Sequence, residues 1–403
     1  MTESVRRVPE PLFPSFPKEE FSWRYRRARE IMDRAGMDLL LLTERENVVY
    51  FSGLVNAAWI VHGLLPGLIL FHRQMNEPVM ILPDFWLGTT EKTTWINDLV
   101  LHRNSHSDPS DFADLVVKVI RSRGWDKATI GYEAGLEMIL GIQIQQFDRI
   151  RSELAGANWV PAGPVLWNIR MIKSQHEIER LRHSAQITNR AQEGLREYVH
   201  PGMNELEIGK LLRLAQIEEG GSDQDRMFLN LRSAGADRFN MTDSLPQNRP
   251  IRQGEVLVVD AGIYLEGYPS DTARCMTVGE PTPFQLSVYE KVIEARDAAL
   301  AVVRPGAKAS DVYFAVRKVY DTAGFPVHID MVGHGLGLDI HEPPMLSPIN
   351  TTPLEENMVL CVEPWVTLPE KETVLTIEDT FVVTKDGWEQ LTLRNADQLW
   401  SVR

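Results

Sequence analysis

Two aspartates lie at the ends of apolar, strand-like runs in the second half of this sequence. Asp260 ends the run that begins at Val256, and Asp271 follows a glycine-containing turn at the start of the next run. A buried carboxylate needs a cation or several hydrogen-bond donors. Two carboxylates facing one cavity repel each other unless a metal ion lies between them. Aspartates that merely form turns show the same pattern, so the pair alone leaves both interpretations open.

Three later residues favour the metal interpretation. His334 lies in a glycine-rich segment, and Glu363 and Glu378 each end or interrupt an apolar run, as Asp260 does. With Asp271, these residues offer mainly carboxylate oxygen and one imidazole. This donor set suits a pair of divalent ions such as Mn, Co, Fe or Zn, whereas a structural zinc site prefers cysteine and histidine. The sequence therefore predicts a dinuclear metal site formed by these five side chains.

The order Asp, Asp, His, Glu, Glu and its flanking residues resemble the prolidase, aminopeptidase P, methionine aminopeptidase and creatinase superfamily. The matching segments are VVDAG, DTAR, GHGLGLDIHEPP, VEP and IEDT, and the resemblance covers about residues 15–395. It implies a pita-bread fold, a homodimer and a hydrolase of a C–N bond in an Xaa-Pro dipeptide or other small substrate. It also implies two divalent ions per chain, of which Mn is favoured.

The resemblance assigns a role to each metal ligand. Asp260 would chelate one ion, Asp271 and Glu378 would bridge the pair, and His334 and Glu363 would complete the shell of the second ion. A water bridging two cations becomes a hydroxide nucleophile near neutral pH.

Two residues of the resembling segments are expected to act on the substrate. Glu363 could pass a proton to the leaving nitrogen. His341, seven residues after His334, matches a family position that hydrogen-bonds the substrate carbonyl or the tetrahedral intermediate. The alternative for His341 is a strand-end histidine satisfied by the backbone.

Three positions depart from the family pattern around the substrate. Asp243 stands where family peptidases carry a substrate-binding His, and Asp330 stands where prolidases commonly have another. Thr376 replaces the Arg that aminopeptidase P-like enzymes carry two residues before the last Glu ligand. We expect Asp243 and Asp330 to contact the substrate together with His341.

These departures keep two other functions open. One is a specialised small-molecule enzyme, either a creatinase-like amidinohydrolase or a dimethylsulfoniopropionate lyase-like enzyme. Creatinases have lost the metal ligands, and that lyase type carries an Asp where this chain has Gly262, so neither is a close match. The other is a non-catalytic binding protein on the peptidase scaffold.

Composition limits the partners and the compartment. The chain of 403 residues carries a net charge of −14, which argues against nucleic acid or an anionic membrane as a partner. Its two cysteines, Cys275 and Cys361, fall in apolar runs, so we expect buried free thiols and a cytoplasmic location. The apolar stretch Leu54–Phe71 is interrupted by polar residues, glycine and proline, which favours a loop and a buried strand over a membrane span.

The elements that must position these residues fall into two predicted domains. Residues 1–165 alternate strands with helices, for example a helix over Glu19–Ala35 and a strand over Asp38–Thr43, so we expect an α/β creatinase/prolidase-like domain preceded by an extended arm at 1–17. In residues 166–403, capping-box spacings begin three of four predicted helices. These helices should cover one face of a curved, largely antiparallel sheet, an α+β pita-bread catalytic domain with the five ligands in its cavity.

Overall fold

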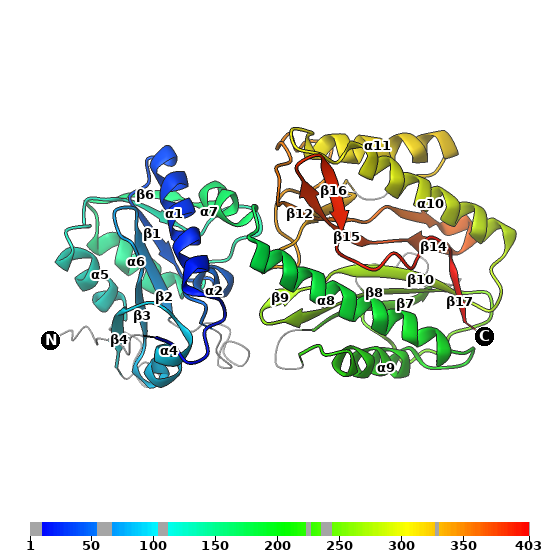
Figure 1. Cartoon of the computed structure of the whole chain (residues 1–403), viewed down its shortest axis with the longest axis horizontal. Helices are drawn as coiled ribbons and strands as arrows, with labels where there is room; N and C mark the ends of the chain where they lie inside the picture. The colour runs from blue at the N-terminus through cyan, green and yellow to red at the C-terminus, as the bar shows by residue number, and fades with distance from the viewer. Residues whose placement is uncertain are drawn as a thin grey trace. The chain divides into compact units, whose positions relative to one another are not determined.

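The computed structural model describes residues 10–54, 67–103, 112–222, 227–234, 244–326 and 330–402. The chain forms two compact units, Met1–Arg170 and Met171–Arg403 (Figure 1). Helix α7 (Gly163–Arg170) ends the first unit and packs against α1 (Lys18–Ala35). The domain boundary expected at 165 therefore falls inside a helix that remains with the first unit.

A mixed six-stranded sheet forms the centre of the first unit. Its order is β4-β3-β2-β1-β5-β6. Pairing is antiparallel where β2 meets β1 and β3, and parallel elsewhere in this sheet. The strands are β1 (Leu39–Leu42), β2 (Leu68–His72), β3 (Val79–Pro83), β4 (Asp98–His102), β5 (Thr129–Tyr132) and β6 (Asn158–Pro161).

Helices cover both faces of this sheet. Helices α5 (Phe112–Ser122) and α6 (Ile144–Glu153) share one apolar cluster with alternate strand residues. On the other face Tyr25 of α1 packs against Phe71 of β2, with ring centroids 5.5 Å apart. Helix α2 (Arg45–Ser52) adds Phe51 to that contact, 5.4 Å from Phe71. The α/β prediction for this half is confirmed, and the structure adds β4 and the short helix α4 (Leu87–Thr93), which the sequence did not predict.

Capping boxes begin three helices of the second unit, as predicted. Ser174, Asn204 and Thr282 each cap a helix with reciprocal side-chain and backbone hydrogen bonds. These helices are α8 (Gln175–Gly194), α9 (Glu205–Glu218) and α10 (Pro283–Val302), and α11 (Ala309–Ala323) follows. Among the described residues, no helix has both the length and the apolar character that crossing a membrane requires.

The described strands of the second unit form three hydrogen-bonded sheets rather than the single curved sheet that was expected. Every ladder is antiparallel except that between β10 and β17. One sheet contains β7 (Met227–Ala234), β8 (Val256–Leu265), β9 (Tyr268–Pro269), β10 (Thr272–Val278) and β17 (Trp400–Val402). The second contains β11 (Gly333–Gly335), β12 (Val359–Val362), β15 (Asp379–Thr384) and β16 (Gly387–Gln390), and β13 (Trp365–Leu368) pairs with β14 (Thr373–Thr376).

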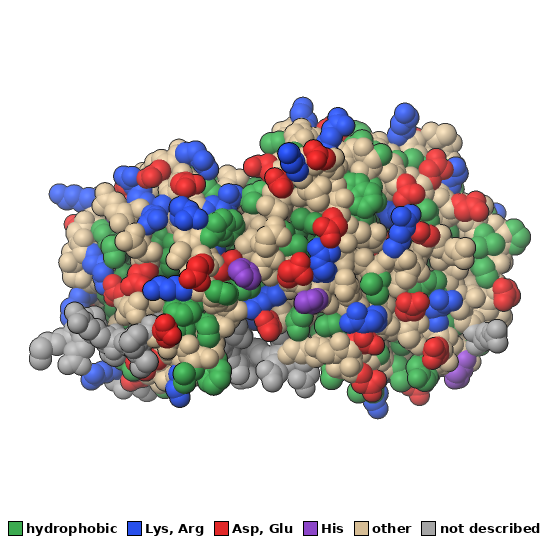
Figure 2. All heavy atoms as spheres, in the orientation of Figure 1, with side chains coloured by type: hydrophobic (Ala, Val, Ile, Leu, Met, Phe, Trp, Pro, Cys, Tyr) green, Lys and Arg blue, Asp and Glu red, His purple; other side chains and the backbone are tan. Residues whose placement is uncertain are grey.

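The charged surface and the state of the two cysteines can be compared with the sequence predictions. On the face drawn in Figure 2, acidic and basic side chains are interspersed over both units. Cys275 and Cys361 are both free and buried, as expected.

A fully buried glutamate fixes the end of β5 in the first unit. Glu133 accepts hydrogen bonds from the Thr43 amide and hydroxyl, at 2.8 and 2.6 Å, and from Asn47 Nδ2 at 3.0 Å. Burial raises the pKa of Glu133 from 4.5 to about 7, against the opposing effect of these hydrogen bonds. The folded state therefore binds a proton here more tightly than the unfolded state does.

This raised pKa predicts a pH-dependent stability. Glu133 contributes fully below about pH 4.5, and that contribution is lost as the pH rises through about 7. From pH 5 to pH 8 we expect the free energy of unfolding to fall by up to about 3 kcal/mol through this group. Denaturant titrations should show a smaller pH slope in Glu133→Gln, whose side chain does not titrate. Equal slopes in both proteins would contradict the assignment.

Candidate metal centre

The five predicted ligands lie within strands or directly beside strand ends. Asp260 lies within β8, and Asp271 directly precedes β10, which pairs with β8. His334 is the central residue of β11. Glu363 directly follows β12 and Glu378 directly precedes β15, two strands of the sheet that contains β11. Each ligand therefore comes from a strand or its immediate end, where the backbone is held by ladder hydrogen bonds.

A buried arginine joins the two sheets beside the site. Arg274 of β10 donates from Nη1 to the Glu378 carbonyl at 2.7 Å and from Nη2 to Asp379 Oδ1 at 2.7 Å. The Glu378 amide donates to the Ala273 carbonyl at 3.1 Å. These bonds fix the start of β15 against β10, and so bring Glu378 next to Asp271.

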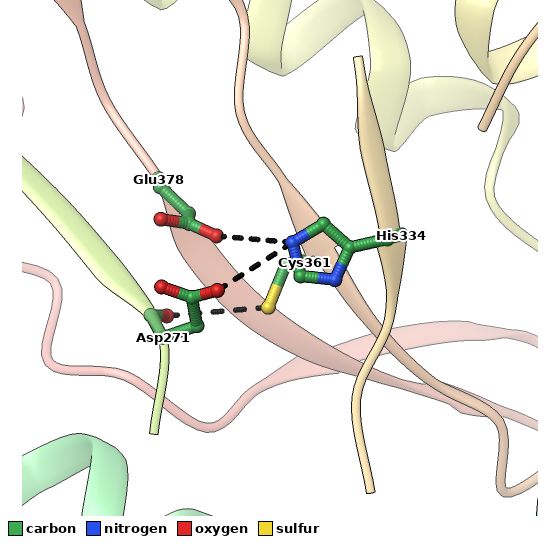
Figure 3. Close-up of side chains that lie close together, drawn as sticks. All are labelled: Asp271, His334, Cys361 and Glu378. Atoms are coloured by element: carbon green, nitrogen blue, oxygen red, sulfur yellow. Dashed lines mark hydrogen bonds and ion pairs between the residues drawn. The ribbon is translucent and has the colours of Figure 1, made fainter. Parts of the chain in front are cut away.

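The His334 ring faces three carboxylates. Its Nε2 lies 3.5 Å from Asp271 Oδ2, 3.6 Å from Glu363 Oε1 and 3.7 Å from Glu378 Oε1. Figure 3 shows Asp271 and Glu378 pointing at the same ring nitrogen. The other nitrogen, Nδ1, lies 3.0 Å from the Gly335 carbonyl, which can only accept. This contact puts the proton on Nδ1 and leaves the Nε2 lone pair directed at the carboxylates, the tautomer that a metal ligand needs.

The fourth carboxylate is held by the neighbouring strand. Asp260 is opposite Asn230 in the β7–β8 ladder, and Asn230 Nδ2 donates to Asp260 Oδ2 at 3.2 Å. The negative charge of Asp260 raises the pKa of both Asp271 and Glu378. All four carboxylates therefore share one electrostatic environment.

Buried carboxylates that repel one another are stabilised when cations bind between them. Burial, and then the neighbouring carboxylates, raise the pKa of Asp271 and Glu378 well above the ordinary values. Within the described part of the chain, Asp271 Oδ1 and Glu378 Oε1 are buried and accept no hydrogen bond. Buried oxygen atoms in this state are expensive unless a positive charge neutralises them. The oxygen-rich donor set with one imidazole fits divalent metal ions.

Beside Glu363 lies Trp365, which no sequence motif marks, and Arg232 lies against the Trp365 ring. Trp365 Nε1 donates to Glu363 Oε2 at 3.0 Å. The guanidinium of Arg232, on β7, lies 5.0 Å from the centre of the Trp365 ring. Trp365 is opposite Thr376 across the β13–β14 ladder. Thr376 is one of the positions that depart from the family pattern.

A buried ion pair shapes the loop between His334 and His341. Glu342 Oε1 accepts from the Leu338 amide at 2.9 Å and the Asp339 amide at 3.2 Å. Its Oε2 lies 3.1 Å from Lys173 Nζ, and both side chains are buried. Backbone bonds of 2.8 and 2.9 Å between Gly335 and Glu342 close the base of the loop. Lys173 and Glu342 thus fix the backbone that carries His341.

His341 lies against the candidate centre. Its ring centroid is 4.1 Å from that of His334, while the residue as a whole is exposed. Desolvation on the side facing the site, and then the charge of His334, lower the pKa of His341. A neutral imidazole can donate one hydrogen bond toward a substrate.

Of the two aspartates that are expected to contact substrate, the structure describes only Asp330. Asp243 lies outside the described residues. Asp330 is exposed and precedes Val332, whose carbonyl accepts from the Glu363 amide at 2.9 Å. Asp330 is therefore close in sequence to the segment that holds Glu363, and its contact with substrate stays a prediction.

Comparisons with known proteins agree with the resemblance drawn from the sequence. The model of metallopeptidase family M24 matches residues 179–385, and that of the creatinase/prolidase N-terminal domain matches residues 24–172. An Xaa-Pro dipeptidase of Pyrococcus horikoshii is 29% identical over 364 residues, which are 90% of this chain and 95% of that protein.

Solved structures share the two-domain fold. A dipeptidase from Mycobacterium ulcerans gives a TM-score of 0.79 at 25% identity, over 96% of this chain and 99% of that chain. An X-Pro aminopeptidase from Thermotoga maritima gives 0.77 at 25% identity, over 94% and 99%. The prediction of an α/β N-terminal domain followed by an α+β pita-bread domain is therefore confirmed.

Removing Asp271 should empty the site. We expect Asp271→Ala to lower metal affinity by more than about a hundredfold and abolish activity, because the loss of even an outer partner of a ligand costs about 10–100-fold. Elemental analysis after Mn incubation measures the metal per chain. Asp386→Ala, an exposed aspartate beyond β15, is the matched control. Full metal content and activity in Asp271→Ala would refute the metal site.

Proposed function

The chain belongs to metallopeptidase family M24, and from that membership we propose that it cleaves Xaa-Pro dipeptides. The family makes it a metal-dependent hydrolase of the peptidase type. The observation that carries the proposal is the convergence of four carboxylates and one imidazole in one buried site. The Xaa-Pro dipeptidase of Pyrococcus horikoshii matches over 90% of this chain, which supports the substrate class.

Two divalent ions per chain fit these ligands. Asp260 would hold one ion, His334 and Glu363 the other, and Asp271 and Glu378 would bridge them. The predominance of carboxylate oxygen favours Mn, with Co, Fe or Zn as alternatives. When bound, the ions supply a water of lowered pKa and polarise the scissile carbonyl.

Glu363 is suited to proton transfer. Its side chain is 15% exposed, compared with 1% for Glu378 and 4% for Asp271. The Trp365 indole holds one of its oxygens at 3.0 Å. The carboxylate is thus fixed in orientation yet reachable from outside, so it can take a proton from the attacking water and give it to the leaving nitrogen.

His341 is suited to the carbonyl side of the reaction. It is exposed next to His334, on a loop fixed by Glu342. A neutral imidazole N–H placed there would donate to the substrate carbonyl and to the oxyanion that forms from it. Asp243 and Asp330 are proposed to contact the rest of the substrate.

The small-molecule alternative is not favoured. All five predicted metal ligands are present, whereas creatinases have lost theirs. At the position where the lyase type carries an Asp, a Cβ on Gly262 would collide with the Ser270 carbonyl oxygen. The backbone at Gly262 therefore has no room for that side chain.

We also propose a homodimer, from the family resemblance, and a cytoplasmic location, from the two free buried cysteines. A solution mass of twice 45.8 kDa would support the dimer, and a monomer mass would contradict it.

A substrate panel tests the proposed activity. Mn-loaded protein should cleave Xaa-Pro dipeptides faster than Xaa-Ala dipeptides, creatine or dimethylsulfoniopropionate, and chelation should remove the activity. An Xaa-Pro-Xaa tripeptide distinguishes a dipeptidase from an aminopeptidase. Preferential turnover of a non-peptide substrate would overturn the proposal.

The same panel tests His341. We expect His341→Ala to retain its metal and to lose about 10²–10³ in kcat, the effect of removing one oxyanion-hole donor. An unchanged kcat would instead favour a strand-end histidine without a catalytic role.

A further inference from the structure

Cys361 lies on the face of β12 that carries the candidate ligands. In the ladders of this sheet it is directly opposite His334 on β11 and Thr380 on β15. Side chains that are opposite or two residues apart share one face of a sheet. Glu363 is two residues after Cys361, and Glu378 is two residues before Thr380. The thiol therefore belongs to the row of side chains that form the centre.

The sulfur is within reach of an ion held by its neighbours. Cys361 Sγ and one ligand atom from each of Asp271, His334 and Glu378 all lie within 4.8 Å of one another. Figure 3 shows the sulfur beside the Asp271 carboxylate and the His334 ring. With metal–ligand bonds of about 2.0–2.3 Å, two ligands of one ion lie up to about 4.5 Å apart. Small side-chain adjustments would bring all four atoms onto one ion.

The buried oxygens supply independent evidence for a ligand at this place. Asp271 Oδ1 and Glu378 Oε1 are inaccessible and accept no hydrogen bond from the described residues. Cys361 is itself 0% exposed. Its sulfur lies 3.7 Å from Thr380 Oγ1 and 4.0 Å from the Asp271 carbonyl, long contacts that leave the sulfur able to turn toward a cation.

We propose that Cys361 is a sulfur ligand of the ion held by His334, and that it makes this position prefer Zn²⁺ or Co²⁺ to Mn²⁺. The inference rests on the metal centre of the proposed function. A thiolate is a soft donor that selects zinc or cobalt over manganese, whereas the position of Asp260 has carboxylate oxygens, which suit manganese. Coordination replaces the S–H bond with a metal–sulfur bond and releases one proton to solvent.

Cys275 provides a matched control. It is the other free, buried cysteine of the chain. Its sulfur accepts a hydrogen bond from the Thr376 amide at 3.4 Å. Cys275 is opposite Val258 in the β8–β10 ladder. A substitution at Cys275 removes a buried thiol close to the centre without touching the row that contains His334.

Cobalt spectroscopy tests the proposal. Wild-type protein, Cys361→Ser, Cys361→Ala and Cys275→Ser would each be stripped of metal and titrated with Co²⁺. We expect a sulfur-to-cobalt charge-transfer band in the near ultraviolet for the wild type and Cys275→Ser only. Competition between Zn²⁺ and Mn²⁺ should show a loss of zinc affinity of about tenfold or more in Cys361→Ser, with a smaller change for manganese.

The outcomes separate this proposal from the metal centre itself. Cobalt bound to the wild type with visible d–d bands but no charge-transfer band would overturn sulfur ligation and leave the carboxylate–histidine site intact. A charge-transfer band that persists in folded Cys361→Ser or Cys361→Ala would overturn it equally. Failure of the wild type to bind Co²⁺, Zn²⁺ or Mn²⁺ would overturn both the sulfur ligand and the proposed function.

Discussion

Three carboxylates around the His334 imidazole, with Asp260 in the same electrostatic environment, are the constraint on which the second unit depends. Burial, and then repulsion between the neighbouring carboxylates, raises the pKa of Asp271 and Glu378. The fold can hold them only because rigid strands prevent them from separating. Arg274 contributes most directly, since it binds the Glu378 backbone and Asp379 at once. Divalent cations bound between the carboxylates would neutralise their charges, and the relief of the repulsion would favour metal binding.

The residues around the ligands divide into those that hold them and those that adjust their chemistry. Asn230 orients Asp260, and the Gly335 carbonyl sets the tautomer of His334. Lys173 and Glu342 form an ion pair that holds the loop that carries His341. Charges buried as a pair are costly to separate, so this loop is resistant to local opening.

The sequence predicted the features that are local or anomalous. Capping boxes are visible because both partners lie within four residues, as at Ser174 and Glu177. The ligands are visible because carboxylates recur at the ends of apolar runs, together with one histidine in a glycine-rich segment. Other features depend on register between distant segments, so one sequence cannot reveal them. The pairing of Asn230 with Asp260 and the alignment of His334 with Cys361 are of this kind, as is the division of the strands into three sheets.

One of the positions that depart from the family, Thr376, lies beside the ligands rather than among them. Thr376 is opposite Trp365, which contacts both Glu363 and Arg232. A change at a ligand would leave its buried partners without a cation, and would cost both stability and activity. A change one residue away alters the charge, the donor atoms or the walls of the site while the ligands stay neutralised. The cost of leaving buried carboxylates without a cation therefore makes substitutions beside the ligands easier to accommodate than substitutions of the ligands themselves.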